Sequence, residues 1–194
     1  PKGREFAARN AECLFIASTS KEWIKDYVDD MRARAVEAGR QPDDLKIFAI
    51  CTPIIGETRA AAEEKLAEYR DYVRTEGALT QISGAMGIDL AEFDLDTPVS
   101  VLADRKTDAP QTAIETLARA SGNPNWTIRQ MGEFAGVGGR TPIFAGSGSD
   151  VAEEIINWVD ETGIDGFNLA YAVMPETFDD FVDHVVPELQ ARDR

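Results

Sequence analysis

The sequence has 194 residues, of which 43% are hydrophobic and 28% charged, and its 35 acidic and 20 basic side chains give a formal net charge of −15. This balance indicates a globular domain with its own core, and the negative charge argues against nucleic-acid and membrane partners. No apolar run approaches the roughly 18 residues of a membrane helix, and no signal peptide is visible, so we expect a cytoplasmic protein.

The chain opens on Gly3-Arg4-Glu5-Phe6-Ala7-Ala8-Arg9, which is typical of a helix over residues 3–11. It has no initiator Met and no strand before this helix, so we expect a truncated product. Residues 12–17 form a continuous apolar run, which predicts a strand buried on both faces. A helix with Thr19 and Glu22 at capping-box spacing follows, and Gly39 is its expected stop.

Two further strands are predicted, one over residues 45–51 before Thr52-Pro53 and one over residues 166–173 before Pro175. Thr58 is the expected cap of the helix after the second strand. Pro187 predicts a kink or a restart of the last helix near residue 186. A long excursion, about 75–149, contains predicted helices over residues 110–120 and 127–135, and a helix over residues 150–162 follows it.

Buried strands that alternate with amphipathic helices predict a parallel sheet with helical crossovers. Three strands are too few to close a barrel, so the pattern fits either a part of a (β/α) barrel or a small open α/β sheet. An insertion as long as residues 75–149 at the carboxyl end of a barrel strand usually shapes the mouth of an active site.

Few residues in these elements indicate chemistry by themselves. Cys13 and Cys51 lie in apolar runs and are expected to be buried free thiols, and His184 is expected at the surface. No Ser/His/Asp or Cys/His set can be built around that single histidine. The strand ends, among them Ser18 and Thr19, could contact a ligand, although helix capping is the commoner role of such residues.

Two glycine-containing loops could also be interpreted as binding sites. The loop of residues 146–149, Gly-Ser-Gly-Ser, could cradle a phosphate at a helix N-terminus, but a plain loop with an N-cap is favoured because Asp150 follows and would repel phosphate. A dinucleotide site at residues 136–140 is disfavoured because no acidic ribose partner can be assigned to it. Lys2, Gly3 and Arg4 form a better anion site, since positive side chains and a helix N-terminus combine there, although from these residues alone a solvated helix start is the safer interpretation.

Three stretches together resemble one family, the bacterial-luciferase-like flavin monooxygenases, in the branch that acts on nitrilotriacetate, EDTA and dibenzothiophene sulfone. The first is Gly3-Arg4-Glu5-Phe6-Ala7-Ala8 with residues 11–15, and the second is Gly146-Ser147 with Val151-Ala152 and Trp158. The third and most specific is residues 162–169, Thr-Gly-Ile-Asp-Gly-Phe-Asn-Leu, followed by residues 186–190.

The resemblance implies that residues 1–194 are the C-terminal portion of a single (β/α)8 TIM barrel, with the insertion at about 75–149 as a lid over the substrate. Lys2, Gly3 and Arg4 would remain of the FMN phosphate site. Phe15, Ala17 and Phe167 would line the flavin or substrate pocket, with plain barrel core as the equal alternative for Phe15 and Phe167. The catalytic groups of the family would lie before Pro1, so we name no catalytic residue and expect the 194-residue piece alone to be inactive.

The activity implied by the resemblance is a two-component monooxygenase. A separate NAD(P)H:flavin reductase would supply reduced FMN, and O₂ would react with it to give a flavin peroxide that oxidises a small organic, xenobiotic-type substrate. Two alternatives stay open, an F420-dependent oxidoreductase of the same superfamily and a small α/β module that binds a phosphate ligand. Apolar helices on the outside of the barrel make a homo-oligomer plausible, and no metal site is expected.

Overall fold

The computed structural model describes residues 2–104, 126–139 and 141–194, and the helix predicted over residues 110–120 lies outside this part of the chain. The chain divides into two compact units. Unit 1 consists of Pro1–Glu63 and Thr141–Arg194, and unit 2 consists of Glu64–Arg140. No described helix has the length and apolar character that crossing a membrane requires.

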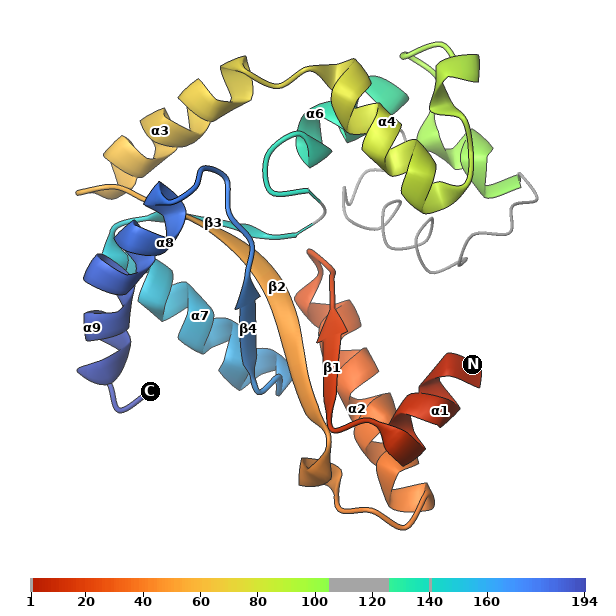
Figure 1. Ribbon diagram of the computed structural model, residues 1–194, viewed down its shortest axis with the longest axis vertical. Helices are drawn as coiled ribbons and strands as arrows, with labels where there is room; N and C mark the ends of the chain where they lie inside the picture. Colours follow the sequence, from red (N-terminus) through yellow and green to blue (C-terminus); the bar gives the residue numbers. More distant parts are fainter. Residues whose placement is uncertain (1, 105–125, 140) are drawn as a thin grey trace. The chain divides into compact units, whose positions relative to one another are not determined.

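Unit 1 is built on a parallel four-stranded sheet (Figure 1). Its strands are β1 (Cys13–Ile16), β2 (Lys46–Ile55), β3 (Ile143–Gly146) and β4 (Gly166–Leu169). Phe48 and Ala49 of β2 pair with β1 and also with β4, so these two strands flank β2 on opposite edges. The later part of β2, Thr52–Ile55, pairs with β3, which the sequence pattern did not identify as a strand.

β2 continues through Pro53, where the sequence predicted that the strand had already ended. The Ala170 N–H donates to the Cys51 carbonyl over 2.8 Å, so the backbone groups of residue 51 face β4, and those of residue 53 face the same side. The pairing of β4 with β2 stops at Cys51. Pro53 therefore removes a donor only where no strand remains to accept from it.

The first strand differs from its prediction because β1 lies at an edge of the sheet in this chain. Ile16 is buried, but Phe15 is 64% exposed and Cys13 is exposed. The expectation of a strand buried on both faces, and of a buried Cys13, is therefore wrong. The physical reason is that Cys13 and Phe15 share one face of β1, over which no described helix of unit 1 packs.

The helices of unit 1 agree with the sequence signals, except that the residue that caps α2 is one position later than predicted. They are α1 (Lys2–Asn10), α2 (Lys21–Glu37), α7 (Gly148–Thr162), α8 (Glu176–Asp180) and α9 (Val186–Gln190), with the start of α3 (Arg59–Asp71) and a short 3-10 turn, Pro42–Asp44. Ser20, and not Thr19, caps α2, since its hydroxyl accepts from the Trp23 N–H over 3.2 Å. Thr58 caps α3 as predicted.

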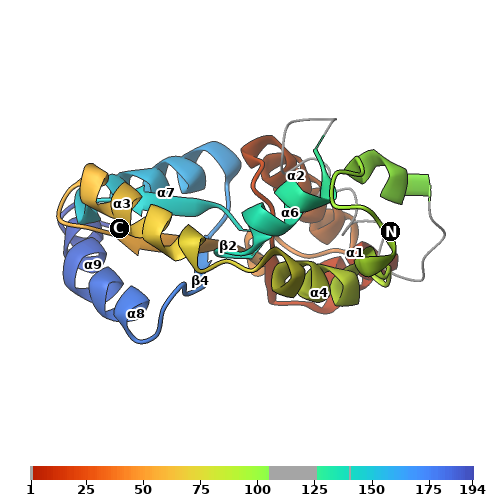
Figure 2. The ribbon, with the colours of Figure 1, turned by 90° about the horizontal axis from the view of Figure 1, so that it is seen from above.

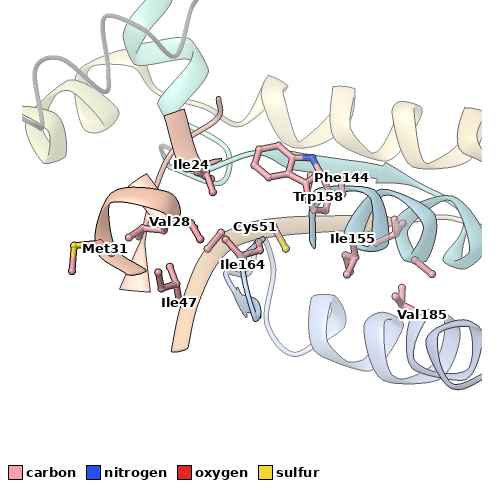
Figure 3. Close-up of a cluster of buried hydrophobic side chains, with 14 of the residues drawn as sticks. Ile24, Val28, Met31, Ile47, Cys51, Phe144, Ile155, Trp158, Ile164 and Val185 are labelled. Carbon is pink, nitrogen blue, oxygen red and sulfur yellow. The ribbon is translucent and has the colours of Figure 1, made fainter. Parts of the chain in front are cut away.

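The core of unit 1 lies between the sheet and the helices α2 and α7 (Figure 3). Alternate residues of β2, namely Ile47, Ala49 and Cys51, are fully buried on this side. They meet Ile24, Val28 and Met31 of α2 and Ile155 and Trp158 of α7. Each large aliphatic side chain buried in this way contributes about 1.5–3 kcal/mol to folding. Figure 2 shows α2 and α7 next to each other, and Lys21 and Glu161 join them by an ion pair of 2.9 Å.

The C-terminal helical segment is interrupted as Pro187 predicts. A π-helical turn over Phe181–Val185 separates α8 from α9, and Pro187 stands in the first turn of α9. Proline has no N–H and its ring crowds the preceding turn, so a continuous α-helix cannot pass through this position. The π turn also brings the His184 carbonyl against Gly148, where a Cβ atom would lie 2.7 Å from the carbonyl carbon.

Unit 2 has a small core of its own. Besides most of α3, it contains α4 (Thr75–Met86), the 3-10 turns Leu90–Glu92 and Val99–Asp104, and α6 (Ile128–Ala135), which the sequence predicted over residues 127–135. Leu79, Ile82 and Met86 of α4 pack with Ile128 and Met131 of α6. Gly132 permits this close packing, since a Cβ there would lie 2.9 Å from Thr75 Cγ2.

Candidate functional site

Within unit 1, helices α2 and α7 cover one face of the sheet, and no described helix of this unit packs against the other face. Phe15 of β1 pairs with Phe48 of β2, and Phe48 pairs with Gly166 of β4, so these three positions form a row across the sheet. A Cβ on Gly166 would lie 3.4 Å from the Phe48 ring, which places the row on one face. We call this side, which carries residues 15, 17, 48, 50, 166 and 168, the open face.

Aromatic side chains dominate the row that Phe15, Phe48 and Gly166 form on the open face. The rings of Phe15 and Phe48 stack with centroids 5.8 Å apart and an angle of 27° between their planes. Gly166 adds no side chain on the other edge of Phe48. A flat, apolar surface of this kind suits a planar conjugated ligand. The next row, two residues along each strand, consists of Ala17, Ile50 and Asn168.

Phe167 does not lie with Phe15. It pairs with Ala49, whose side chain is fully buried on the helix-covered face. Its ring contacts Phe144 edge-on at 5.6 Å and Trp158 at 6.1 Å, and it borders a groove of about 370 Å³ between β4, α7 and α9. Side chains alternate between the two faces of a strand, so Phe15 and Phe167 belong to opposite sides of the sheet. The structure therefore places Phe15 and Ala17 on the open face and Phe167 on the helix-covered face.

The carboxyl ends of the strands lie at the same edge of the sheet because the strands are parallel. Ser18, at the end of β1, is 4% exposed and accepts a hydrogen bond from the Ser20 N–H over 3.1 Å, so it acts within its own turn. After β4, Thr177 Oγ1 accepts from the N–H groups of Ala172 and Val173 over 3.3 and 3.2 Å. This anchor, which the sequence did not reveal, fixes the loop that follows β4.

The proposed anion site at the start of α1 is accessible. Lys2 and Gly3 are exposed, and a Cβ on Gly3 would meet nothing within 4 Å, so an anion could approach the backbone closely there. Arg4 is partly engaged, since Nη1 lies 2.7 Å from Asp30 Oδ2 and the guanidinium sits 4.6 Å above the Tyr27 ring. A guanidinium has five N–H donors, so this pair leaves some of them for a phosphate.

Asp30 holds Arg4 and Arg34 together. Its carboxylate accepts from Arg34 Nε over 2.9 Å and from Arg4 over 2.7 Å. Hydrogen bonding by Arg34, and then by Arg4, lowers the pKa of Asp30 below its usual 3.8 against the opposing effect of burial. Asp30 therefore stays ionised at neutral pH and orients Arg4 beside the start of α1.

The Gly146–Ser149 loop is a helix cap. Ser147 Oγ accepts from the Asp150 N–H over 3.3 Å, and Asp150 Oδ2 accepts from the Ser147 N–H and hydroxyl over 2.9 and 2.7 Å. Arg59 pairs with the same carboxylate at 2.7 Å. These hydrogen bonds, the Ser147 hydroxyl's foremost, lower the pKa of Asp150. The carboxylate thus takes the donors that a phosphate would need, which supports the N-cap interpretation over the phosphate cradle.

The remaining reactive side chains do not form a catalytic set. His184 is exposed on the π turn, as expected, and Cys51 is fully buried. Burial raises the pKa of the Cys51 thiol to about 12, so it stays protonated and is a poor nucleophile. Within residues 2–104, 126–139 and 141–194, no three His, Cys, Asp or Glu side chains gather in a way that could hold a metal ion.

A parallel sheet with helices over one face and an apolar open face is the kind of unit from which (β/α) barrels are assembled. The family model described as "Luciferase-like monooxygenase" matches residues 1–166 of the chain. The chain belongs to this family, and its sheet and helices are part of a luciferase-like TIM barrel.

The chain is 42% identical over 193 residues to a dimethyl-sulfide monooxygenase of Hyphomicrobium sulfonivorans, a match that covers 100% of this chain and 40% of the relative. The crystal structure of DmoA from the same organism superposes with a TM-score of 0.84 at 42% identity, again over 100% and 40% of the two chains. A riboflavin lyase solved with modified FMN and riboflavin gives a TM-score of 0.80 at 30% identity, over 99% and 41%. The chain thus spans about two fifths of the length of these relatives.

Proposed function

We propose that this protein is a monooxygenase that uses reduced FMN and O₂ to oxidise a small organic substrate. The observation that carries the proposal is the open face, where Phe15 and Phe48 stack beside Gly166 in a chain of the luciferase-like family. Reduced FMN, when bound, supplies the electrons that activate O₂. The residues of this chain bind and orient that cofactor and the substrate.

The side chains present fit a flavin in two places. Lys2, Gly3 and the free N–H groups at the start of α1 offer positive charge and close backbone approach to the phosphate, with Arg4 held beside them by Asp30. Phe15 and Ala17 offer an apolar wall to the ring system. Such a wall also keeps water from the reacting groups, which protects reactive species from side reactions.

We further propose that residues 75–149 are an insertion of the same barrel domain that covers the substrate side. A separate NAD(P)H:flavin reductase would deliver the reduced FMN, and the protein would act as a homo-oligomer in the cytoplasm. The substrate classes suggested by the relatives are small sulfides and sulfones, since a dimethyl-sulfide monooxygenase and a dibenzothiophene-sulfone monooxygenase are among them.

The test is anaerobic titration of the whole protein with photoreduced FMN and, separately, with reduced F420, followed by admission of O₂ in the presence of dimethyl sulfide or dibenzothiophene sulfone. We expect saturable binding of FMNH₂, weak or absent binding of F420, and an oxygenated product from one of the two substrates. Tight F420 binding without FMNH₂ binding would overturn the proposal in favour of an F420-dependent oxidoreductase.

A further inference from the structure

The loop that follows β4, residues 170–175, belongs to the part of the fold that builds active sites. In TIM-barrel enzymes the active site lies at the carboxyl ends of the strands and is formed by the loops that follow them. The chain is part of a luciferase-like TIM barrel, and Figure 1 shows this loop continuing from the carboxyl end of β4 into α8. We call residues 170–175 the β4 loop, and its conformation matters for the site whether or not its side chains are covered in this chain.

Thr177 holds the β4 loop by hydrogen bonds within unit 1. The residue is buried, and its Oγ1 accepts from the Ala172 N–H over 3.3 Å and from the Val173 N–H over 3.2 Å. The Thr177 N–H donates in turn to the Val173 carbonyl over 2.9 Å. One hydroxyl oxygen therefore satisfies two backbone donors in the middle of the loop, and both donors would lose this partner without it.

The β4 loop is also tied at its start. The Ala170 N–H donates to the Cys51 carbonyl of β2 over 2.8 Å, and the Tyr171 ring contacts the Phe178 ring of α8 with centroids 6.0 Å apart. These contacts fasten the loop to β2 and α8, and Thr177 joins its middle to the same helix. The loop is therefore held in one conformation before a ligand binds, and a loop held in this way loses less entropy on binding.

The proposed flavin contacts lie on the other side of β2. Phe15 belongs to β1, which pairs with the edge of β2 opposite to β4, and Lys2 and Gly3 belong to the helix before β1. The β4 loop therefore fits a contact with the substrate better than a contact with the flavin. We propose that Thr177 is a positioning residue, which fixes the β4 loop against the organic substrate and so sets the KM, an inference that rests on the proposed function. Without the anchor the binding conformation of the loop is only partly populated, and the apparent affinity falls by that fraction.

The test compares Thr177→Val with Thr177→Ser in the whole protein. Valine keeps the shape of threonine but cannot accept from the two N–H groups, whereas serine keeps the hydroxyl. With dimethyl sulfide or dibenzothiophene sulfone as substrate, we expect Thr177→Val to raise the KM about tenfold, while kcat and the Kd for FMN stay within about twofold of wild type. Hydrogen–deuterium exchange of residues 170–175, followed by mass spectrometry, should become faster. Thr177→Ser should restore the KM and the exchange of the wild type.

The matched control is Thr162→Val, the same exchange at a buried threonine of α7. The Thr162 hydroxyl donates to the Trp158 carbonyl over 2.6 Å, and the residue precedes the amino end of β4 rather than following its carboxyl end. This variant also loses a buried hydrogen bond, so its stability in urea should fall much as that of Thr177→Val does. Its KM and the exchange of the β4 loop should stay those of the wild type.

The outcomes separate the inference from the proposed function. If Thr177→Val keeps the KM of the wild type, the β4 loop does not position the substrate and the inference is wrong, also when the Kd for FMN rises instead. An equal rise of the KM in Thr162→Val would attribute the effect to lost stability and would overturn the inference as well. If the wild type oxidises neither substrate, the proposed function fails, and this is seen before any variant is compared.

Discussion

Asp165, in the turn between α7 and β4, ties three elements together at the end of the sheet away from the carboxyl ends of the strands. Its Oδ2 accepts from the buried Ile47 N–H over 2.9 Å, and Lys46 and Arg32 pair with the carboxylate at 3.2 and 3.4 Å. We expect Asp165→Ala to destabilise the protein strongly and to leave FMN binding unchanged. Asp165→Asn, which keeps an oxygen for the Ile47 N–H, should destabilise it much less.

The magnitude follows from the partners. An unpaired buried N–H costs about 1–3 kcal/mol, and each partly exposed ion pair contributes about 0–1 kcal/mol. Asp165→Ala should therefore lower the free energy of unfolding by roughly 2–4 kcal/mol, and Asp165→Asn by about 1–2 kcal/mol. Arg32 is left without its carboxylate in both variants, which matters because its Nε has no partner among the described residues.

The assay is urea unfolding of the whole protein followed by circular dichroism, with the Kd for FMN measured on the same preparations. Asp160→Ala is the control, because Asp160 forms only an exposed ion pair with Arg194 at 3.0 Å and should cost less than about 1 kcal/mol. Equal stability of Asp165→Ala and Asp165→Asn would refute the role of the Ile47 N–H. A changed Kd for FMN would refute the assignment of Asp165 to stability alone.

Three further predictions concern α7 and the core. Gly148→Ala should lower the free energy of unfolding by about 1–3 kcal/mol through overpacking. Gly84→Ala, within α4 at a position where a Cβ meets no other atom, should instead raise it by up to about 1 kcal/mol. Thermal melting curves of both variants check these two changes. Ser147→Ala should lower the free energy of unfolding, measured in urea, by about 1 kcal/mol. Because the pKa of Asp150 is lowered below 3.8, the stability that this carboxylate contributes should be present above pH 3.8 and be lost as the pH falls through the lowered value. Cys51 should resist iodoacetamide in the native protein below pH 9.0 and react once the chain is unfolded, which mass spectrometry of the labelled peptide detects. Between pH 9.0 and about 12 the thiol releases its proton in the unfolded chain only, so the free energy of unfolding should fall as the pH rises through this window.

The sequence predicted the elements whose periodicity is strong. The end of the helix predicted over residues 150–162, the cap at Thr58 and the break before Pro187 are all confirmed. Each depends on local interactions, which the order of residues encodes directly. β3 was not predicted because four residues are too few to show a period. β2 was predicted too short because a proline fits within a strand only where no neighbouring strand needs its N–H, and the sequence alone does not show where the pairing with β4 ends.

The candidate site was less accessible from sequence. Phe15 and Phe167 were expected to line one pocket, but they lie on opposite faces of the sheet, because the register of β1 and β4 with β2 decides which face each side chain takes. Phe48 was missed for the same reason.

The segment Glu64–Arg140, which forms unit 2, joins unit 1 at both ends, and the residues of unit 1 next to these ends are fastened to one another. Thr52 Oγ1 and Thr141 Oγ1 lie 2.9 Å apart, the Thr52 N–H donates to the Pro142 carbonyl over 2.9 Å, and Arg59 is tied to Asp150. A segment clamped at its base in this way can change in length or composition at a small entropic cost, because the ends stay together whatever lies between them. The length or composition of the segment between these ends could therefore change while the strands of unit 1 keep their register.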